Sequence, residues 1–142
     1  MARKDIKEAL ALDLMSIQPG EFFTKSISAV TSQYIEFEKV DKYKCPAIVF
    51  SDGGAKITKN SENVQEVEWT IYLFAYIKED NAEAALDLLL EDIMTLFMDM
   101  TGLKIFEVGI REVEVGAVMP DPIIISKFEA IGYIPITLRY IR

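Results

Sequence analysis

Histidine is absent from this chain of 142 residues, and cysteine occurs only once, at Cys45. Without histidine the chain cannot form a Ser-His-Asp triad, a histidine general base or a histidine metal ligand. A single cysteine cannot form a disulfide within one chain, which is typical of proteins in a reducing compartment. Lys42 and Lys44 precede Cys45, but no histidine or second cysteine is present to activate it. We therefore expect no enzyme activity and no catalytic, cofactor or metal site.

Positive charge is also scarce. Lys and Arg number 15 against 23 Asp and Glu, which gives a net charge of -8. A domain that binds nucleic acid by neutralising phosphates is basic, so this class of function is excluded. A channel through which DNA passes without binding is still compatible with this charge. With 51% hydrophobic and 27% charged residues, the composition predicts one folded domain over residues 1–142.

Long apolar runs are missing too. None approaches the roughly 20 residues that a membrane-spanning helix needs. The first ten residues, MARKDIKEAL, mix charged and apolar residues and lack the continuous apolar stretch of a secretion signal. We therefore expect a protein that is not exported and that has no membrane partner.

Two segments have the residue spacing of amphipathic helices. Ile6, Leu10 and Leu14 recur at helical intervals and QPG ends the pattern, which predicts a helix over residues 3–16. A longer helix is predicted over residues 81–100, after the acidic link KEDN and before TG.

The clearest strand covers residues 64–78, because its residue types alternate. One face holds Val67, Trp69, Ile71, Leu73, Ala75 and Ile77. The other face begins with Glu66, Glu68 and Thr70 and continues with Tyr72, Phe74 and Tyr76. We therefore expect the first face to be buried, and the aromatic half of the second face to be covered as well.

Shorter patterns predict two earlier strands, YIEFEKV at 34–40 and AIVF at 47–50. The sequence SDGG at 51–54 predicts a turn, followed by a polar loop or hairpin tip at 55–63. The stretch SDGGAK lacks the GK[ST] ending of a phosphate-binding loop and precedes a polar segment instead of a helix, so we interpret it as a turn.

Two later strands complete the predicted fold. KIFEVGIREVEV, at 104–115, predicts a strand with Phe106, Val108 and Ile110 inward and a bulge near residues 111–112. In the last strand Pro135 cannot donate a ladder hydrogen bond, which favours an edge or irregular pairing. Its buried face is expected to hold Phe128, Ala130, Gly132, Ile134, Ile136, Leu138 and Tyr140. The order α-β-β-β-α-β-β predicts an α+β fold with the helices on one side of a mainly antiparallel sheet.

The long helix carries an acidic stripe, defined as Glu83, Asp87 and Glu91, at intervals of four residues. The stripe is either an ordinary solvated face or an acidic surface that faces a partner or a lumen. A divalent-cation site is a weaker interpretation, because helical carboxylates lack the organising loop of such sites.

The same helix has more apolar residues than one core-facing stripe requires. Three of them lie outside the stripe expected to pack on the sheet, namely Leu88, Met94 and Met98. We predict that these residues contribute to an interface between subunits, together with Tyr72, Phe74 and Tyr76 of the long strand. The alternative is a helix buried deeply in its own domain.

The segment YKCPAIVFSDGGAKITKNSENVQEVEWTIYLFAYIKEDNAEAALDLLLEDIMTLFMDM resembles tail terminator proteins of long-tailed bacteriophages. A Pro-Ala pair opens a short buried strand, a polar excursion follows, and a long strand centred on residues 69–76 leads through an acidic turn into a single long helix. An N-terminal helix precedes these elements and a final strand, YIPITLRYI, ends them. The likeness is one of layout and covers nearly the whole chain.

The resemblance implies a structural virion protein without enzyme activity. Such proteins form a hexameric ring that caps the tail tube, stops its polymerisation and joins the tail to head-completion or neck proteins. The implied partners are therefore copies of the chain itself, the tail tube protein and the neck proteins, with DNA passing through the lumen. The implied location is the neck-proximal end of the virion tail, after assembly in the host cytoplasm.

Other classes of function stay open from the sequence. Another neck, connector or tail tube protein would share the α+β layout. A small ligand-binding domain could enclose a pocket with Tyr72, Phe74 and Tyr76. An enzyme would need a pair of carboxylates with opposed pKa values in a cleft.

Overall fold

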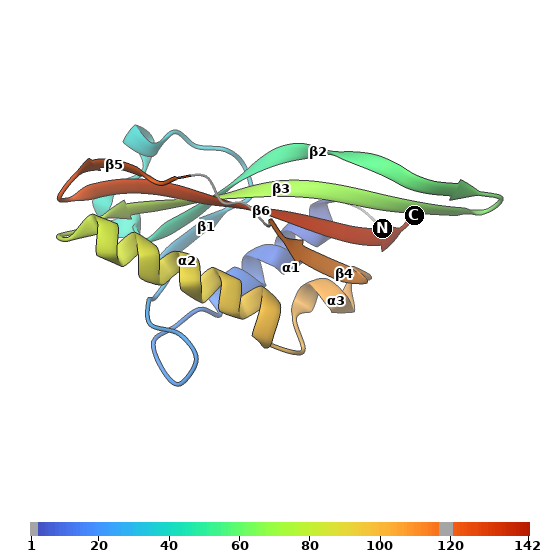
Figure 1. Ribbon diagram of the computed structural model, residues 1–142, viewed down its shortest axis with the longest axis horizontal. Helices are drawn as coiled ribbons and strands as arrows, with labels where there is room; N and C mark the ends of the chain where they lie inside the picture. The colour runs from blue at the N-terminus through green and yellow to red at the C-terminus, as the bar shows by residue number, and fades with distance from the viewer. Residues whose placement is uncertain (1–2, 117–120) are drawn as a thin grey trace.

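The computed structural model describes residues 3–116 and 121–142, which form an α+β fold (Figure 1). Six strands make one sheet in the order β1-β2-β3-β6-β4, and β5 also pairs with β6. Only the β1–β2 pair is parallel, so the predicted fold class is confirmed. The elements are α1 (Arg3–Met15), β1 (Ala29–Thr31), β2 (Ala47–Ser61), β3 (Val64–Lys78), α2 (Ala82–Asp99), α3 (Lys104–Glu107), β4 (Glu112–Val115), β5 (Ile123–Ser126) and β6 (Glu129–Ile141).

Both long helices cover the same face of the sheet, as Figure 1 shows. Leu10 and Leu14 of α1 share one apolar core with Leu86 and Ile93 of α2 and with Trp69 of β3. Removing such a side chain from water contributes about 1.5–3 kcal/mol to folding. The two predicted helices and their side of the sheet are therefore confirmed. No helix in the described part of the chain is long and apolar enough to cross a membrane.

The strands β3 and β6 form the centre of the sheet and pair along their length, from Glu66 opposite Ile141 to Lys78 opposite Glu129. Buried and partly buried residues alternate along most of both strands, as the sequence predicted. Phe128 is an exception, because it precedes β6 and is exposed.

Pro135 lies where the outer side of β6 passes from β5 to β4. Its carbonyl oxygen accepts a hydrogen bond from the Gly116 N–H at 2.8 Å on the β4 side. The N and O atoms of one strand residue point to the same side, so the missing N–H also faces outward. The proline therefore removes no bond to β3. The predicted edge position is wrong, because β6 lies between β3 and β4, whereas the irregular pairing holds for the outer side, where β5 gives way to β4.

The segment 34–40 is not the predicted strand. It contains a 3-10 turn (Phe37–Lys39) that lies over the face of the sheet opposite the helices. Side chains of β3 satisfy its backbone: Tyr76 Oη and Lys78 Nζ donate to carbonyl groups of this segment at 2.6–2.8 Å. The Phe37 ring packs edge to face on Tyr76. The alternation of apolar residues thus reflected burial on the sheet and not a strand backbone.

The predicted turn at 51–54 is also wrong, because β2 continues through it. The glycines form a bulge, at which the pairing with β3 shifts between Asp52 and Ala55. Gly54 has a φ of 93°, which favours glycine, and its N–H donates to Asp52 Oδ1 at 2.8 Å. The chain reverses only near Asn63, where φ is 67°.

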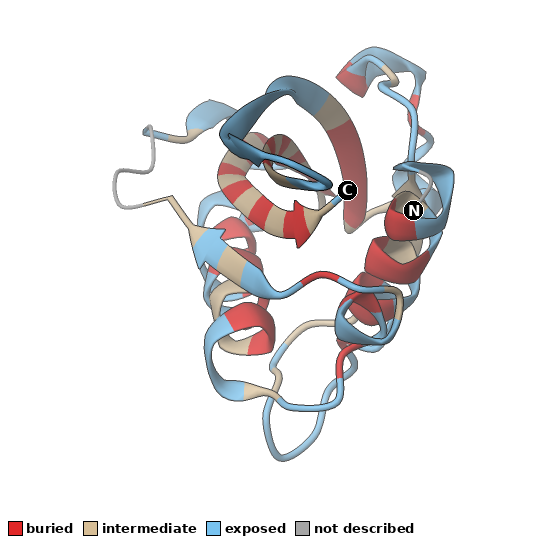
Figure 2. Ribbon diagram, turned by 90° about the vertical axis from the view of Figure 1, so that its right-hand side faces the viewer, coloured by how far each residue is buried: buried red, intermediate tan, exposed pale blue. Residues whose placement is uncertain are grey.

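The hairpin therefore extends far beyond the core. We call residues 55–66 the arm. Most of its side chains are exposed on both faces, and Figure 2 shows its strands in pale blue at the end nearest the viewer. Of the two predicted alternatives for 55–63, a polar loop or a hairpin tip, the structure shows the hairpin, with both strands paired and a tight tip.

The segment 104–110 forms no strand either. Residues 104–107 form the short helix α3, whose first N–H groups donate to the carboxylate of Asp13 in α1 at 2.7 and 3.0 Å. Phe106, which was predicted to point inward, is exposed, while Ile110 is buried as expected. The buried carboxylate thus favours a helical turn here, and the strand begins only at residue 112.

Candidate assembly surfaces

The described residues, 3–116 and 121–142, contain no group of three acidic or cysteine side chains that could hold a metal ion. Cys45 is only partly exposed, and burial raises the pKa of its thiol even though Lys78 lies nearby. A protonated thiol is a poor nucleophile.

The three predicted interface residues of α2 differ in their exposure to solvent. Met98 is 69% exposed and Leu88 is 37% exposed, so both are accessible to another molecule. Met94 is partly buried and packs against the main core. Two of these three side chains are therefore available at the surface of a single copy.

The aromatic row of β3 lies on the face opposite the helices. Tyr72 and Phe74 are partly exposed and contact the ring of Tyr133 at centroid distances of 5.7 and 5.2 Å. Tyr76 is buried beneath Phe37 in the same chain. Tyr72 and Phe74 can therefore reach a second molecule, whereas Tyr76 contributes to the fold of its own copy.

The acidic stripe of α2 is exposed along its whole length. None of Glu83, Asp87 and Glu91 forms an ion pair with another residue in the described part of the chain. The stripe therefore presents uncompensated negative charge to the surroundings.

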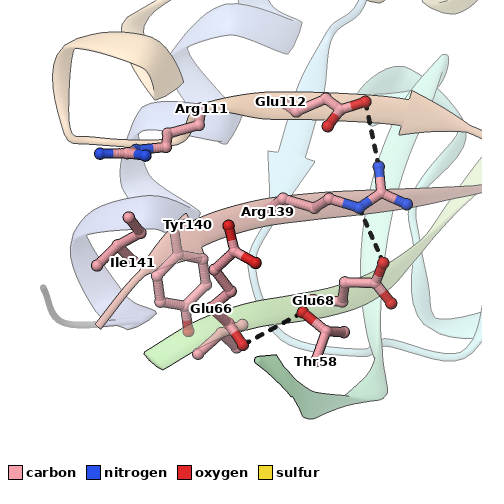
Figure 3. A pocket seen from close by; sticks show the side chains of 9 residues that line it. Thr58, Glu66, Glu68, Arg111, Glu112, Arg139, Tyr140 and Ile141 are labelled. Carbon is pink, nitrogen blue, oxygen red and sulfur yellow. Dashed lines mark hydrogen bonds and ion pairs between the residues drawn. The ribbon is translucent and has the colours of Figure 1, made fainter. Parts of the chain in front are cut away.

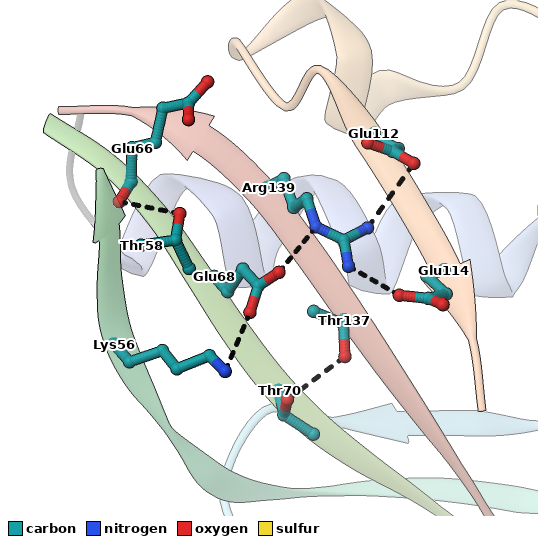
Figure 4. Close-up of polar contacts among 9 residues, drawn as sticks. All are labelled: Lys56, Thr58, Glu66, Glu68, Thr70, Glu112, Glu114, Thr137 and Arg139. Atoms are coloured by element: carbon teal, nitrogen blue, oxygen red, sulfur yellow. Dashed lines mark hydrogen bonds and ion pairs between the residues drawn. The ribbon is translucent and has the colours of Figure 1, made fainter.

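A charged network, which the sequence analysis did not identify, occupies the same face of the sheet as the aromatic row. Arg139 of β6 contacts Glu68 of β3 at 2.8 Å and Glu112 and Glu114 of β4 at 3.4 and 2.6 Å (Figure 4). Lys56 of β2 contacts Glu68 at 3.3 Å. The network thus connects four strands across the sheet.

The network shifts the acidity of its members. The hydrogen bonds that Arg139 donates to Glu114 and Glu68 raise the pKa of Arg139. The hydrogen bond from Arg139 lowers the pKa of Glu68, and the partial burial of Glu68 opposes this effect. Both groups are therefore firmly charged near neutral pH.

A shallow pocket of about 370 Å³ lies between this network and the arm (Figure 3). Figure 3 shows Arg139 between Glu68 and Glu112, with Thr58 and Glu66 on the arm below them. Arg139, one of the two arginines that line the pocket, is already held by carboxylates of the same chain. The ion pairs of Arg139 therefore link neighbouring strands of the sheet beside this pocket.

Two buried carboxylates were also missed. Asp92 of α2 accepts hydrogen bonds from the N–H groups of Thr24 at 3.0 and 3.1 Å and of Lys25 at 2.7 Å. Asp13 does the same for α3, and burial raises its pKa although hydrogen bonds from Lys104 and Ile105 lower it. Each acid occurs in the apolar stripe of its helix. This position among apolar residues was the sequence signal that could have predicted a buried carboxylate.

The strand β5 forms an exposed apolar surface, which we call the isoleucine edge and define as Ile123, Ile124, Ile125 and Phe128. Its three isoleucines are 41–61% exposed. In β5, Ile123 lies opposite Ile131 and Ile124 lies opposite Ala130, so neighbouring isoleucines point to opposite faces of the sheet. Exposed apolar strands at a sheet edge are usually covered by a partner.

Sequence comparison agrees with the arrangement of these elements. No curated protein is similar enough in sequence to count as a relative. A family described as "Bacteriophage Tail Tube Terminator Protein" matches residues 1–141, which is nearly the whole chain. With an α+β fold and exposed apolar surfaces, and with a match of this extent, the chain belongs to the bacteriophage tail tube terminator family.

Proposed function

We propose that this chain forms a hexameric ring on the neck-proximal end of the phage tail tube. There it stops tube polymerisation and joins the tail to the head-completion or neck proteins. The family match over residues 1–141 is the observation that carries this proposal. The ring is a structural part of the virion, assembled in the host cytoplasm, and catalyses no reaction.

The exposed apolar side chains support assembly into a ring. Met98 and Leu88 on α2, and Tyr72 and Phe74 on β3, lie on opposite faces of the subunit. A ring with rotational symmetry needs two different contact surfaces on each copy, because each copy touches two neighbours through unlike patches. Surfaces on two sides of the molecule meet this requirement.

The net charge supports a passage for DNA. A wall that carries carboxylates repels phosphates, so DNA slides through without binding. The acidic stripe on α2 is an exposed acidic surface that faces either a lumen or a partner, whereas the glutamates around Arg139 are paired with Arg139 and Lys56.

The function can be tested in phage that lack this gene. We expect tails of irregular and excessive length that carry no heads, and rescue by the wild-type gene. Tails of normal length joined to heads would refute the proposal. Electron microscopy of the particles measures both outcomes.

A single substitution then tests the predicted interface on α2. Met98→Glu should fold, because the side chain is exposed in the isolated copy, but burying the new carboxylate between subunits costs several kcal/mol. We expect loss of rings and the same long tails. Leu12→Glu changes a similarly exposed apolar residue on α1 and serves as the matched control. Normal rings with Met98→Glu would exclude this residue from the interface.

A further inference from the structure

The isoleucine edge and the arm lie at opposite ends of the molecule, as Figure 1 shows. The helix α2 begins next to the isoleucine edge, where Ala82 N–H donates to the carbonyl of Lys127 at 2.8 Å. This end of the molecule therefore combines exposed apolar side chains with the start of the acidic stripe.

The opposite end contains a notch of about 460 Å³ beneath the arm. Ile57, Val67 and Tyr140 give it apolar walls, and Ile57 is 49% exposed. The remaining lining residues are Arg3, Ala55, Lys56 and Arg142, so three basic side chains and no acidic side chain belong to the lining. The notch thus exposes one isoleucine, Ile57, beside three basic side chains, which we call the basic rim, while Val67 and Tyr140 are buried.

The cations at this rim are available to a partner. Arg3 contacts Asp52 at 3.5 Å and Lys56 contacts Glu68 at 3.3 Å, but more than half of each of these basic side chains is exposed. Exposed ion pairs of this kind are weak and are readily exchanged for other partners. An acidic surface that approaches the notch would therefore be attracted to it.

We infer that the isoleucine edge of one copy docks into the notch beneath the arm of the next copy, with the acidic stripe facing the basic rim. This inference rests on the proposed ring and adds one pair of surfaces, at the two ends of each copy, to the interface residues already proposed on α2 and β3. Both surfaces expose isoleucine side chains and carry opposite charges beside them, and such complementary charge gives an interface specificity. Because the two surfaces are unlike and lie at opposite ends, the contact runs head to tail and can close a ring.

Two substitutions each block one side of the contact. Ile57→Arg fills the notch, and Ile124→Arg places a cation on the isoleucine edge, where it meets the basic rim. Both positions are exposed in a single copy, so circular dichroism should show an unchanged fold. We expect each variant to weaken ring assembly on the order of a hundredfold, as for a central interface residue, by native mass spectrometry and sedimentation. Ile57→Ser and Ile124→Ser should weaken it less, in the same direction.

Mixing the two arginine variants gives the sharper result. The intact edge of the Ile57→Arg copy fits the intact notch of the Ile124→Arg copy, whereas the other two surfaces are both blocked. The mixture should therefore form dimers with one copy of each variant and nothing larger. Tyr43→Arg, at a position that is 77% exposed outside both surfaces, is the control and should still form rings.

The outcomes separate the docking from the proposed function. If the wild type and both arginine variants form rings equally well, the docking is refuted and the ring stands. Closed rings from the mixture would also refute it. If the wild-type chain is monomeric both in solution and on tail tubes, the ring and the docking fail together.

Discussion

Replacing Asp92 should destabilise the subunit by disconnecting the loop before β1 from α2. The carboxylate is only 4% exposed and accepts hydrogen bonds from two backbone N–H groups, those of Thr24 and Lys25. A hydrogen bond to a charged group contributes roughly 1.5–3 kcal/mol, and an unsatisfied buried N–H loses its hydration as well. Thr24 lies near solvent, so water replaces part of the loss. We expect Asp92→Ala to lower the free energy of unfolding by about 3 kcal/mol.

Two comparisons make this prediction specific. Asp92→Asn keeps one acceptor oxygen and should lose about 1.5 kcal/mol. Asp87→Ala removes an exposed acid from the same helix and should change stability by less than about 0.5 kcal/mol. Urea unfolding, followed by far-ultraviolet circular dichroism, measures all three free energies.

Hydrogen exchange locates the effect. The amides of Thr24 and Lys25 should exchange faster in Asp92→Ala, because their acceptor is gone while the core on the sheet persists. An Asp92→Ala protein with the stability of Asp87→Ala would refute the reasoning and show that water satisfies the two N–H groups fully.

Three further predictions concern the bulge, the second buried acid and the charged network. A Cβ on Gly53 would lie 2.8 Å from the Tyr72 ring and 2.9 Å from the Thr70 carbonyl. Gly53→Ala should therefore lower the free energy of unfolding by about 1–3 kcal/mol in urea unfolding. A Cβ on Gly20 would meet no atom within 4 Å, so Gly20→Ala should not lower it. Asp13 has a raised pKa in the folded state, so the native protein holds the Asp13 proton more tightly than the unfolded chain does. Its contribution to stability should therefore fall as pH rises above 3.8. Urea midpoints measured against pH should lack this decrease in Asp13→Asn, and an unchanged decrease would contradict the assignment. Glu68 has a lowered pKa, so its contribution to stability should be present above pH 4.5 and lost as pH falls. The difference in urea midpoint between wild type and Glu68→Gln should therefore shrink in acid and in high salt. A difference that persists under those conditions would exclude an ionic cause.

Periodic burial was readable from the sequence wherever one element packs on one core. The spacing of Leu10 and Leu14 placed α1, and the alternation through Trp69 placed β3, because helices and strands repeat their inward positions every 3.6 and 2 residues. The missing histidine and the acidic balance limited the chemistry before any fold was known. The layout of these elements was also enough to indicate the family.

Contacts between segments that are distant in the sequence decided the backbone conformation of the elements that were predicted wrongly. Segment 34–40 has apolar residues at strand spacing, yet hydrogen bonds from Tyr76 and Lys78 hold it in another conformation. Asp13 selects a helical turn at residue 104, which is 91 positions away along the chain. No local pattern contains such partners.

The surfaces depended on tertiary structure most of all. Gly53 and Gly54 have the composition of a turn, but pairing with β3 carries β2 through them as a bulge and so creates the arm. The apolar run Ile123–Ile125 could equally have been buried, and only its place at the outer edge of β6 leaves it exposed. The sequence thus determined which residues avoid water, whereas the tertiary structure decided which of them remain for a neighbouring molecule, because exposure depends on what the rest of the chain covers.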